Sequence, residues 1–247
     1  MKCLLKMNGA QFALKNQQMH SFFVDEIRQG KAYLSKDDLH HAKRVLRLKD
    51  GEEIIIAYEG VRYMAKYSVS QAHAEIIDTL PSNEASAKIT LYQAILKGDR
   101  MDYVLQKCTE IGVVEFFPCI MKRCVARDAD NKLKRWQRIA KEAACQSMRN
   151  IVPTVNMPIT TEEMVEKLAR HELAIVPWEN AKQNGLRQIY KGEKDIAIVI
   201  GPEGGITEEE IDLLGVNTVT LGKRILRSET AGLVAATGIL LLSGDME

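Results

Sequence analysis

The sequence predicts an α/β protein with two parts, a small β-rich unit and a larger unit in which strands alternate with helices. Residues 19–82 contain closely spaced runs of β-branched and aromatic residues, which favour short strands. From about residue 83 onward, apolar runs alternate with stretches of helical periodicity, which is typical of a mostly parallel sheet covered by helices. One strand of that sheet runs directly into the glycine-rich segment Gly201–Gly205.

The composition limits the class of protein. The chain has 247 residues, enough for one large domain or two smaller ones. Hydrophobic residues make up 46% and charged residues 27%, the proportions of an ordinary soluble globular protein. A net charge of +1 excludes a highly basic tail as the means of nucleic-acid binding but allows a local basic patch.

Cysteine usage and the absence of targeting patterns predict a cytoplasmic protein. The five cysteines include no C-x-x-C pair, which argues against a disulfide framework or a zinc ribbon and favours a reducing compartment. The longest apolar run is too short to cross a bilayer, so no membrane partner is expected. Residues 1–18 lack the apolar core of a signal peptide and are predicted to be a disordered extension.

The small unit is predicted to combine one helix with a short antiparallel meander. Phe22–Val24 favours a strand, and Asp37–Leu48 has apolar residues at helical spacing, with Ser35 or Asp37 as the N-cap. Three strand-like runs follow, at residues 52–58, 61–69 and 72–78. A helix beside such a meander suggests a compact barrel.

The larger unit begins after a predicted linker at Pro81–Asn83. Strands are predicted at residues 89–95, 113–120, 172–177, 195–200 and 216–221. Helices are predicted at residues 99–112, 133–148, 160–171 and 229–243. No internal repeat interrupts this alternation.

The segment from Ile196 to Glu210 reads as strand, glycine loop and helix. Its β-branched run stops at Gly201–Gly205, whose sequence is GPEGG, and Thr207 stands three residues before Glu210 in the spacing of a capping box. Such a loop leaves backbone groups free to bind a small ligand at the carboxyl end of a strand. The plain alternative is a turn that only connects two elements.

Two other strand ends are candidates for the same site, Ala174–Glu179 and Leu221–Ala231. If the three strands are neighbours, their loops form a ligand crevice. The alternative is that Arg227 is a surface or capping residue and that Glu229 is an ordinary helix N-terminal carboxylate. The chain has no Walker A, G-x-G-x-x-G, H-E-x-x-H or G-x-S-x-G pattern, and no metal site is predicted.

Basic residues are unevenly distributed. Arg123 follows one predicted strand, and Arg135 and Arg149 belong to the basic series along the next helix. His41, Arg44 and Arg47 are clustered in the small unit. Each run alone is typical of a solvated helix face. Combined, they would form a phosphate-binding track.

Several motifs in order along the chain resemble one family. They are Phe22–Val24, His41 with Val45–Arg47, Lys97–Arg100, Gln106–Gly112, Arg123, Arg135–Trp136, Glu142–Ala143, Gln146–Ser147, Arg149, Pro153, Gly201–Gly205 and Leu221–Ala231. The chain resembles the ribosomal RNA small subunit methyltransferase E family, the 16S rRNA uracil(1498)-N3-methyltransferases of the SPOUT superfamily. The set covers almost the whole chain from Met19.

The resemblance implies a SPOUT-type α/β domain with a deep trefoil knot at residues 83–247, preceded by a PUA-like β-barrel RNA-binding domain at residues 19–82. It implies S-adenosylmethionine as methyl donor, a homodimer, and 16S rRNA in the assembled 30S subunit as substrate. A SPOUT enzyme with another RNA target, or a non-catalytic ribosome-binding protein, are the competing hypotheses. The family often has an arginine where this chain has Ser21, which puts RNA affinity in question at that position.

The resemblance also implies roles for individual residues. The expected cofactor-binding residues are Pro177, Gly201, Pro202, Glu203, Gly204, Gly205, Leu221, Gly222, Ile225, Leu226, Thr230 and Ala231. Arg227 and Glu229 are the expected catalytic residues: Arg227 would stabilise negative charge on the uracil oxygens, and Glu203 or Glu229 would orient it. The group that removes the uracil proton stays open. The expected RNA-binding residues are His41, Arg44, Arg47, Lys97, Arg100, Arg123, Arg135 and Arg149.

Overall fold

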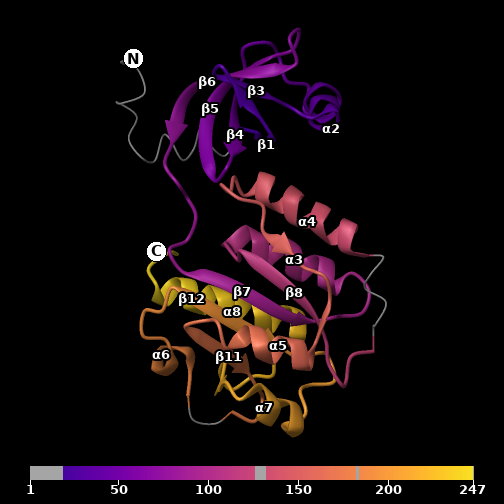
Figure 1. The fold of residues 1–247 in the computed structure, drawn as a ribbon, viewed down its shortest axis with the longest axis vertical. Coiled ribbons are helices and arrows are strands. Elements are labelled where there is room, and N and C mark those ends of the chain that lie inside the picture. Colours follow the sequence, from indigo (N-terminus) through magenta and orange to yellow (C-terminus); the bar gives the residue numbers. More distant parts are fainter. Residues whose placement is uncertain (1–18, 126–131, 182–183, 247) are drawn as a thin grey trace. The chain divides into compact units, whose positions relative to one another are not determined.

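The computed structural model describes residues 19–125, 132–181 and 184–246, and the predicted extension at residues 1–18 lies outside this part (Figure 1). The chain divides into two compact units. The first unit runs to Asn83 and also includes Cys145–Ile151, and the second comprises Glu84–Ala144 and Val152–Glu247. The sequence did not predict that Cys145–Ile151 belongs with the first unit.

Hydrogen bonds explain why Cys145–Ile151 belongs to the first unit. The Arg62 guanidinium donates to the carbonyl oxygen of Met148 at 3.1 Å, and the side-chain amide of Asn83 donates to the same oxygen at 2.8 Å. The side-chain amide of Asn150 donates to the carbonyl oxygen of Gly60 at 2.9 Å. The carbonyl oxygens of Met148 and Gly60 thereby find their hydrogen-bond donors within the first unit.

The first unit is a six-stranded sheet with the order β1-β4-β5-β6-β3-β2. Its strands are β1 (Ser21–Phe23), β2 (Ile27–Arg28), β3 (Lys31–Tyr33), β4 (Glu53–Tyr58), β5 (Val61–Ser68) and β6 (His73–Leu80). The predicted meander is confirmed, because β4, β5 and β6 pair antiparallel, whereas β1 joins β4 in parallel. Alternate residues of β4, Ile54 and Ile56, are buried in one core with Phe22 and Tyr67.

The predicted helix at Asp37–Leu48 is only partly right. Helix α2 (Lys36–His40) begins after Ser35, whose hydroxyl oxygen accepts the N–H of Asp38 at 3.1 Å. It continues as a π-helix, η2 (His41–Val45), and stops before Leu48, because Arg47 has left-handed backbone angles with φ of +55°. A non-glycine residue in that region cannot continue a right-handed helix.

The second unit is a parallel sheet in the order β10-β8-β7-β12-β11-β13, with β9 beside β8. The strands are β7 (Lys88–Ala94), β8 (Glu115–Ile120), β9 (Thr154–Val155), β10 (Ile159–Thr160), β11 (Leu173–Pro177), β12 (Asp195–Ile200) and β13 (Asn217–Val219). Every pair is parallel, which confirms the predicted fold class. Short strands β9 and β10 were not predicted, because two residues leave no pattern.

Helices cover both faces of this sheet (Figure 1). They are α3 (Arg100–Ile111), α4 (Leu133–Gln146), α5 (Thr161–Leu168), α6 (Leu186–Ile189), α7 (Glu208–Leu214) and α8 (Ser228–Leu242). On β12, Ile196 and Ile198 face the core that holds α3, α4 and α8, whereas Ala197 and Val199 face the core under α5 and α7. Burial on both faces explains the unbroken apolar runs of these strands. Among the described residues, no helix combines the length and apolarity that crossing a bilayer requires.

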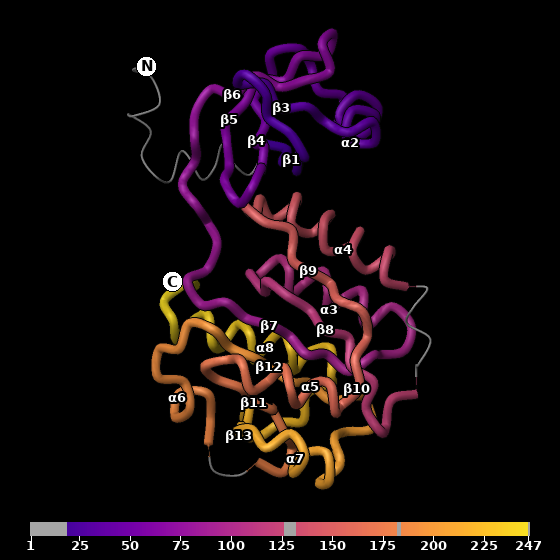
Figure 2. Tube along the Cα trace, viewed as in Figure 1, coloured from indigo at the N-terminus to yellow at the C-terminus, as the bar shows by residue number. Residues whose placement is uncertain are grey.

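The chain near β13 lies between two parts of the segment that leaves β11 and enters α6 (Figure 2). The N–H of Trp178 donates to the carbonyl oxygen of Val219 at 3.0 Å, and the N–H of Thr220 donates to that of Asn184 at 2.8 Å. Hydrogen bonds to both ends of the connection from β11 to α6 are expected if the chain at Val219 and Thr220 passes through that connection. The trefoil knot itself stays a prediction.

Asp245 ties the end of α8 to the start of β7, and we expect Asp245→Ala to lower the free energy of unfolding by about 1–3 kcal/mol. Its carboxylate accepts the N–H groups of Ser86 and Ala87 at 2.8 and 3.0 Å and the hydroxyl of Ser243 at 2.7 Å. Burial opposes ionisation, but these hydrogen bonds outweigh it and lower the pKa of Asp245 below its usual 3.8.

The stabilisation that Asp245 provides depends on pH. Because the pKa of Asp245 is lower in the folded state, its stabilisation is present above pH 3.8 and is lost as pH falls through the lowered pKa. Urea unfolding of the wild type and of Asp245→Ala at neutral pH and at pH 3 checks this. A difference between the two proteins that does not shrink at acid pH would contradict the assignment.

Candidate active site

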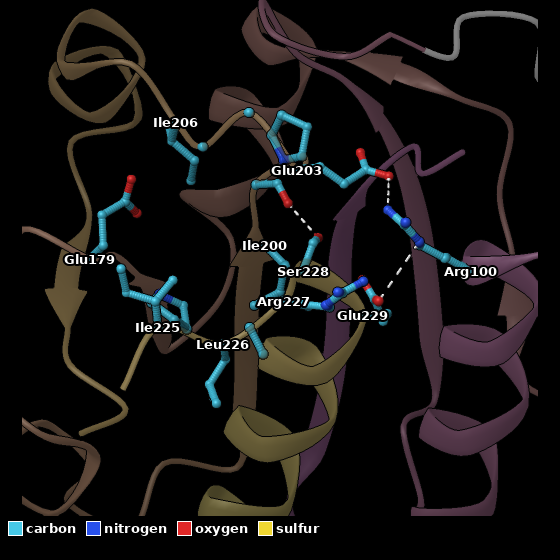
Figure 3. Close-up of a pocket in the computed structure, with 16 residues that line it drawn as sticks. Arg100, Glu179, Ile200, Glu203, Ile206, Ile225, Leu226, Arg227, Ser228 and Glu229 are labelled. Atoms are coloured by element: carbon cyan, nitrogen blue, oxygen red, sulfur yellow. Dashed lines mark hydrogen bonds and ion pairs between the residues drawn. The ribbon is translucent and has the colours of Figure 1, made fainter. Parts of the chain in front are cut away.

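Three loops meet at the carboxyl end of the parallel sheet. They follow β11, β12 and β13, and β11 pairs directly with both β12 and β13. Together with the start of α8 they enclose a cavity of about 450 Å³, called here the first cavity (Figure 3). Its walls are Arg100, Pro177, Glu179, Ile200, Gly201, Pro202, Glu203, Gly204, Gly205, Ile206, Ile225, Leu226, Arg227, Ser228, Glu229 and Ala231. The predicted crevice between neighbouring strand ends therefore exists.

The glycine loop turns tightly and is fixed at its end by the predicted capping box. Thr207 accepts the N–H of Glu210, whose carboxylate accepts the N–H of Thr207 in return. The Glu210 side chain is 1% exposed and also accepts the N–H of Lys122 at 2.8 Å. A buried carboxylate with this many donors is satisfied and structural.

Two glycines of the loop stand where a side chain does not fit. A Cβ atom at Gly201 would lie 2.3 Å from Cγ1 of Ile206, and one at Gly205 would lie 2.9 Å from the Glu179 carboxylate. Gly205 also has φ of +76°, which other residues rarely adopt. The loop backbone can therefore lie close to the other walls of the cavity.

Ser228 joins the glycine loop to the first turn of α8. Its hydroxyl donates to the carbonyl oxygen of Gly201 at 2.5 Å and accepts from the side-chain amide of Gln93 at 2.9 Å. Gln93 is the penultimate residue of β7 and is fully buried. Three elements that are distant in sequence are thereby held together beneath the first cavity.

Charged side chains gather on one side of the first cavity, away from Glu179 (Figure 3). Arg100 donates to Glu203 at 2.9 Å, and its Nε lies 3.8 Å from Oε1 of Glu229. The other carboxylate oxygen of Glu229, Oε2, is buried and has no hydrogen-bond partner within the described structure. Arg227 lies on the same wall, immediately before α8. A carboxylate with one free oxygen beside the Arg100 guanidinium can accept a proton or a hydrogen bond from a ligand.

A second cavity of about 660 Å³ adjoins the first. Arg100 and Glu229 line both cavities. The remaining walls of the second cavity are Lys97, Gly98, Asp99, Tyr103 and Thr230, which come from the start of α3 and the start of α8. The two cavities therefore offer adjacent sites for two reactants.

No thiolate competes as a nucleophile at Cys124, which follows Arg123. Burial raises the pKa of the Cys124 thiol, and the charges of Glu203 and Glu210 raise it further. A protonated, buried thiol is inert. Within the described residues, no group of three His, Cys, Asp or Glu side chains is placed to bind a metal ion.

Most residues predicted to bind the cofactor line the first cavity, including Pro177, Gly201–Gly205, Ile225, Leu226 and Ala231. Three do not. Thr230 lines the second cavity, and Leu221 packs against the core. Gly222 forms a turn with φ of +112°, in which its N–H donates to the hydroxyl of Thr220. Leu221 and Gly222 come before Ile225, where the chain first reaches the first cavity, and Thr230 faces the second cavity instead.

Seven of the eight predicted RNA-binding residues fall into three groups. His41, Arg44 and Arg47 are exposed in the first unit, and Lys97 and Arg100 line the second cavity. Arg123 donates to the carbonyl oxygen of Gly204 at 2.9 Å, and Arg135 pairs with Asp99 and Asp102, so both also stabilise the fold. Arg149 differs, because it is 3% exposed. Its burial argues against a direct RNA contact, for which a guanidinium must reach solvent.

Four residues on the walls of the first cavity were not predicted: Glu179, Ile200, Ile206 and Ser228. Glu179 ends the segment Ala174–Glu179, so its position after a strand was a usable signal. Ile200 and Ile206 look like ordinary core residues in the sequence. Ser228 stands at the start of a helix, and its bond to Gly201 joins positions that no local pattern connects.

Comparisons with known proteins agree with this architecture. Residues 83–240 match the profile of an RNA methyltransferase domain, and residues 34–80 match that of an RNA methyltransferase PUA domain. Ribosomal RNA small subunit methyltransferase E of Mesomycoplasma hyopneumoniae (strain 232) is 37% identical over 226 residues, which cover 89% of this chain and 98% of the relative. The enzyme of the same name from Bacillus subtilis (strain 168) is 32% identical, with 92% and 100% covered.

Solved structures extend the likeness to the fold. A ribosomal RNA small subunit methyltransferase E from Neisseria gonorrhoeae, bound to S-adenosyl methionine, matches with a TM-score of 0.82 and 35% identity over 91% of this chain and 98% of that chain. A putative methyltransferase from Legionella pneumophila, in complex with the same cofactor, matches with a TM-score of 0.81 and 29% identity, with the same coverage. Sequence and fold agree along both units, and the chain belongs to the ribosomal RNA small subunit methyltransferase E family of RNA methyltransferases.

Proposed function

We propose that this protein uses S-adenosylmethionine to methylate N3 of one uridine, position 1498 in the family's numbering, in the 16S rRNA of the assembled 30S subunit. The observation that carries the proposal is the first cavity, which three strand-end loops build from the residues that the family resemblance singled out. The donor would bind in this cavity and the RNA base beside it. The proposed setting is the cytoplasm.

The residues of the first cavity fit this cofactor. A volume of about 450 Å³ lies within the range of small-ligand pockets. Gly201 and Gly205 allow close backbone approach, Ile225 and Leu226 offer apolar surface to an adenine ring, and the carboxylates of Glu179, Glu203 and Glu229 favour a positively charged ligand. When bound, S-adenosylmethionine supplies a methyl group on a sulfonium, whose C–S bond breaks with the electron pair left on sulfur.

The chain's own residues would handle the uracil. As N3 takes up the methyl group, it must lose its proton, and Oε2 of Glu229 is a buried acceptor without a partner. We assign Glu229 as the proton acceptor. Arg227, on the same wall, would stabilise the negative charge that spreads onto the uracil oxygens. Arg100 would hold Glu229 in place through their 3.8 Å contact.

A homodimer is part of the proposal. Helix α8 leaves Val234 and Leu241 exposed on an otherwise apolar helix. Exposed apolar side chains on such a helix are typical of a subunit interface. Sedimentation equilibrium of the protein would test this, and a monomer at micromolar concentration would contradict it.

The test of the function is methyl transfer from labelled S-adenosylmethionine to 30S subunits that lack this modification, followed by nucleoside analysis. Label in N3-methyluridine at one site supports the proposal. Label in another nucleoside would favour a methyltransferase with a different RNA target. No label and no binding of the donor would favour a non-catalytic ribosome-binding protein. Free 16S rRNA serves as the control for the assembled subunit.

A further inference from the structure

We infer that the second cavity receives the target nucleotide and that Tyr103 is the surface on which its base stacks. The inference rests on the proposed function and adds the place where the nucleotide that receives the methyl group would bind. A base buried in folded RNA must be turned out of its stack before an enzyme can reach its ring nitrogen. Unstacking is unfavourable, so an enzyme that turns a base out must offer a replacement partner for its flat face.

The position of the second cavity suits the base that accepts the methyl group. Methyl transfer requires the accepting nitrogen to face the donor's methyl group directly, which places the two reactants in adjoining sites. Arg100 and Glu229 form walls of both cavities, so they lie at the border between donor and acceptor. A base in the second cavity would present its edge at this border, next to the free Oε2 of Glu229.

The lining of the second cavity suits a nucleotide. Its volume of about 660 Å³ falls in the range of small-ligand sites. Tyr103 is 44% exposed and is the one aromatic side chain on its walls, among the described residues. Lys97 adds an exposed positive charge for the phosphate that follows the base into the cavity.

The wall opposite α8 is held in place. The carboxylate of Glu203 accepts the N–H of Lys97 at 3.2 Å and the guanidinium of Arg100 at 2.9 Å. Glu203 belongs to the glycine loop of the first cavity, so one side chain fixes walls of both sites. Tyr103 follows in the first turn of α3, where its N–H donates to the carbonyl oxygen of Asp99 at 3.0 Å. The stacking surface is therefore carried by a rigid helix.

The polarity at the border favours uracil over cytosine. The N3 edge of uracil presents a hydrogen donor between two oxygen acceptors, whereas N3 of cytosine carries a lone pair. A carboxylate oxygen accepts the N3–H of uracil but repels the lone pair of cytosine. Arg100, which lines both cavities, is a donor for a flanking oxygen. Stacking on Tyr103 would select any base, and Glu229 would select uracil.

The experiment compares Tyr103→Ala with Tyr103→Phe. Because stacking of one base on an aromatic side chain is lost, we expect Tyr103→Ala to lower kcat/KM for 30S subunits about 5- to 150-fold. Tyr103→Phe keeps the ring and should stay close to wild type. Affinity for S-adenosylmethionine, measured by calorimetry without RNA, should be unchanged in both. Leu213→Ala, which removes a comparably exposed apolar side chain from α7 outside both cavities, is the matched control.

Two results would overturn the inference. One is wild-type kcat/KM for Tyr103→Ala. The other is a loss of donor affinity or a change of oligomeric state in Tyr103→Ala that accounts for its lower activity. Failure of the wild-type protein itself to form N3-methyluridine would contradict the proposed function as well. If the wild-type protein forms N3-methyluridine and Tyr103→Ala does so equally well, only the placement of the target base on Tyr103 is contradicted.

Discussion

Replacing Glu229 with glutamine is expected to lower kcat for uridine methylation by about 10²- to 10⁴-fold, the usual contribution of a positioned acid or base. Glutamine has the same shape, and its amide oxygen still accepts a hydrogen bond from N3, so RNA binding is retained. It cannot take the proton, however. The measurement is single-turnover methylation of 30S subunits at saturating donor, with KM determined in parallel.

Glu203→Gln is the matched control for Glu229→Gln. Both carboxylates contact Arg100, but Glu203 lies outside the second cavity and its oxygen already accepts hydrogen bonds from Lys97 and Arg100. Glu203 lines the first cavity, so we expect Glu203→Gln to weaken the binding of S-adenosylmethionine more than it lowers the single-turnover rate. Equal losses of rate in the two variants would mean that the carboxylates only position Arg100, and the assignment of Glu229 as proton acceptor would be wrong.

Gly201→Ala is expected to weaken S-adenosylmethionine binding by about 5- to 150-fold, which corresponds to the roughly 1–3 kcal/mol cost of overpacking. The added methyl group would lie 2.3 Å from Cγ1 and 3.0 Å from Cδ1 of Ile206, so Ile206 or the glycine loop must move. Either movement changes the wall of the first cavity, to which both residues belong. Calorimetric titration of the donor measures the effect.

A second substitution tests the cause of that loss. Ile206→Ala removes the two atoms that the new methyl group would meet, so the double variant Gly201→Ala/Ile206→Ala should bind the donor better than the two separate losses predict. Strict additivity of the two effects would show that the collision with Ile206 is not the reason. Gly201 would then matter for another property of its backbone.

The location of the site followed from the sequence because it depends on strand ends. Parallel strands bring their carboxyl ends to one edge, so recognising the runs before Gly201 and Glu179 as strands was enough to predict a crevice there. The capping box at Thr207 was also local and was predicted correctly. Patterns of this kind lie within a few residues and need no knowledge of the remaining chain.

Contacts between distant positions were beyond such patterns. Gln93 lies in an apolar run and its amide reaches Ser228, 135 residues later in the chain. Arg149 belongs to a series of basic residues that suggests an exposed surface, yet it is buried. Arg47 ends a helix whose apolar spacing continues to Leu48, because its backbone is left-handed. In each case tertiary structure decided the outcome.

The hydrogen bonds of Cys145–Ile151 have a consequence for how such a protein can be divided or recombined. The chain passes between the two units three times, after Asn83, after Ala144 and after Ile151. A gene fragment that stops at Asn83 would lack the Met148 and Asn150 groups that bind Arg62 and Gly60. The PUA-like half is therefore not an interchangeable cassette. Exchanging it between relatives requires a matching change inside the catalytic half, and the two halves are expected to have been inherited together.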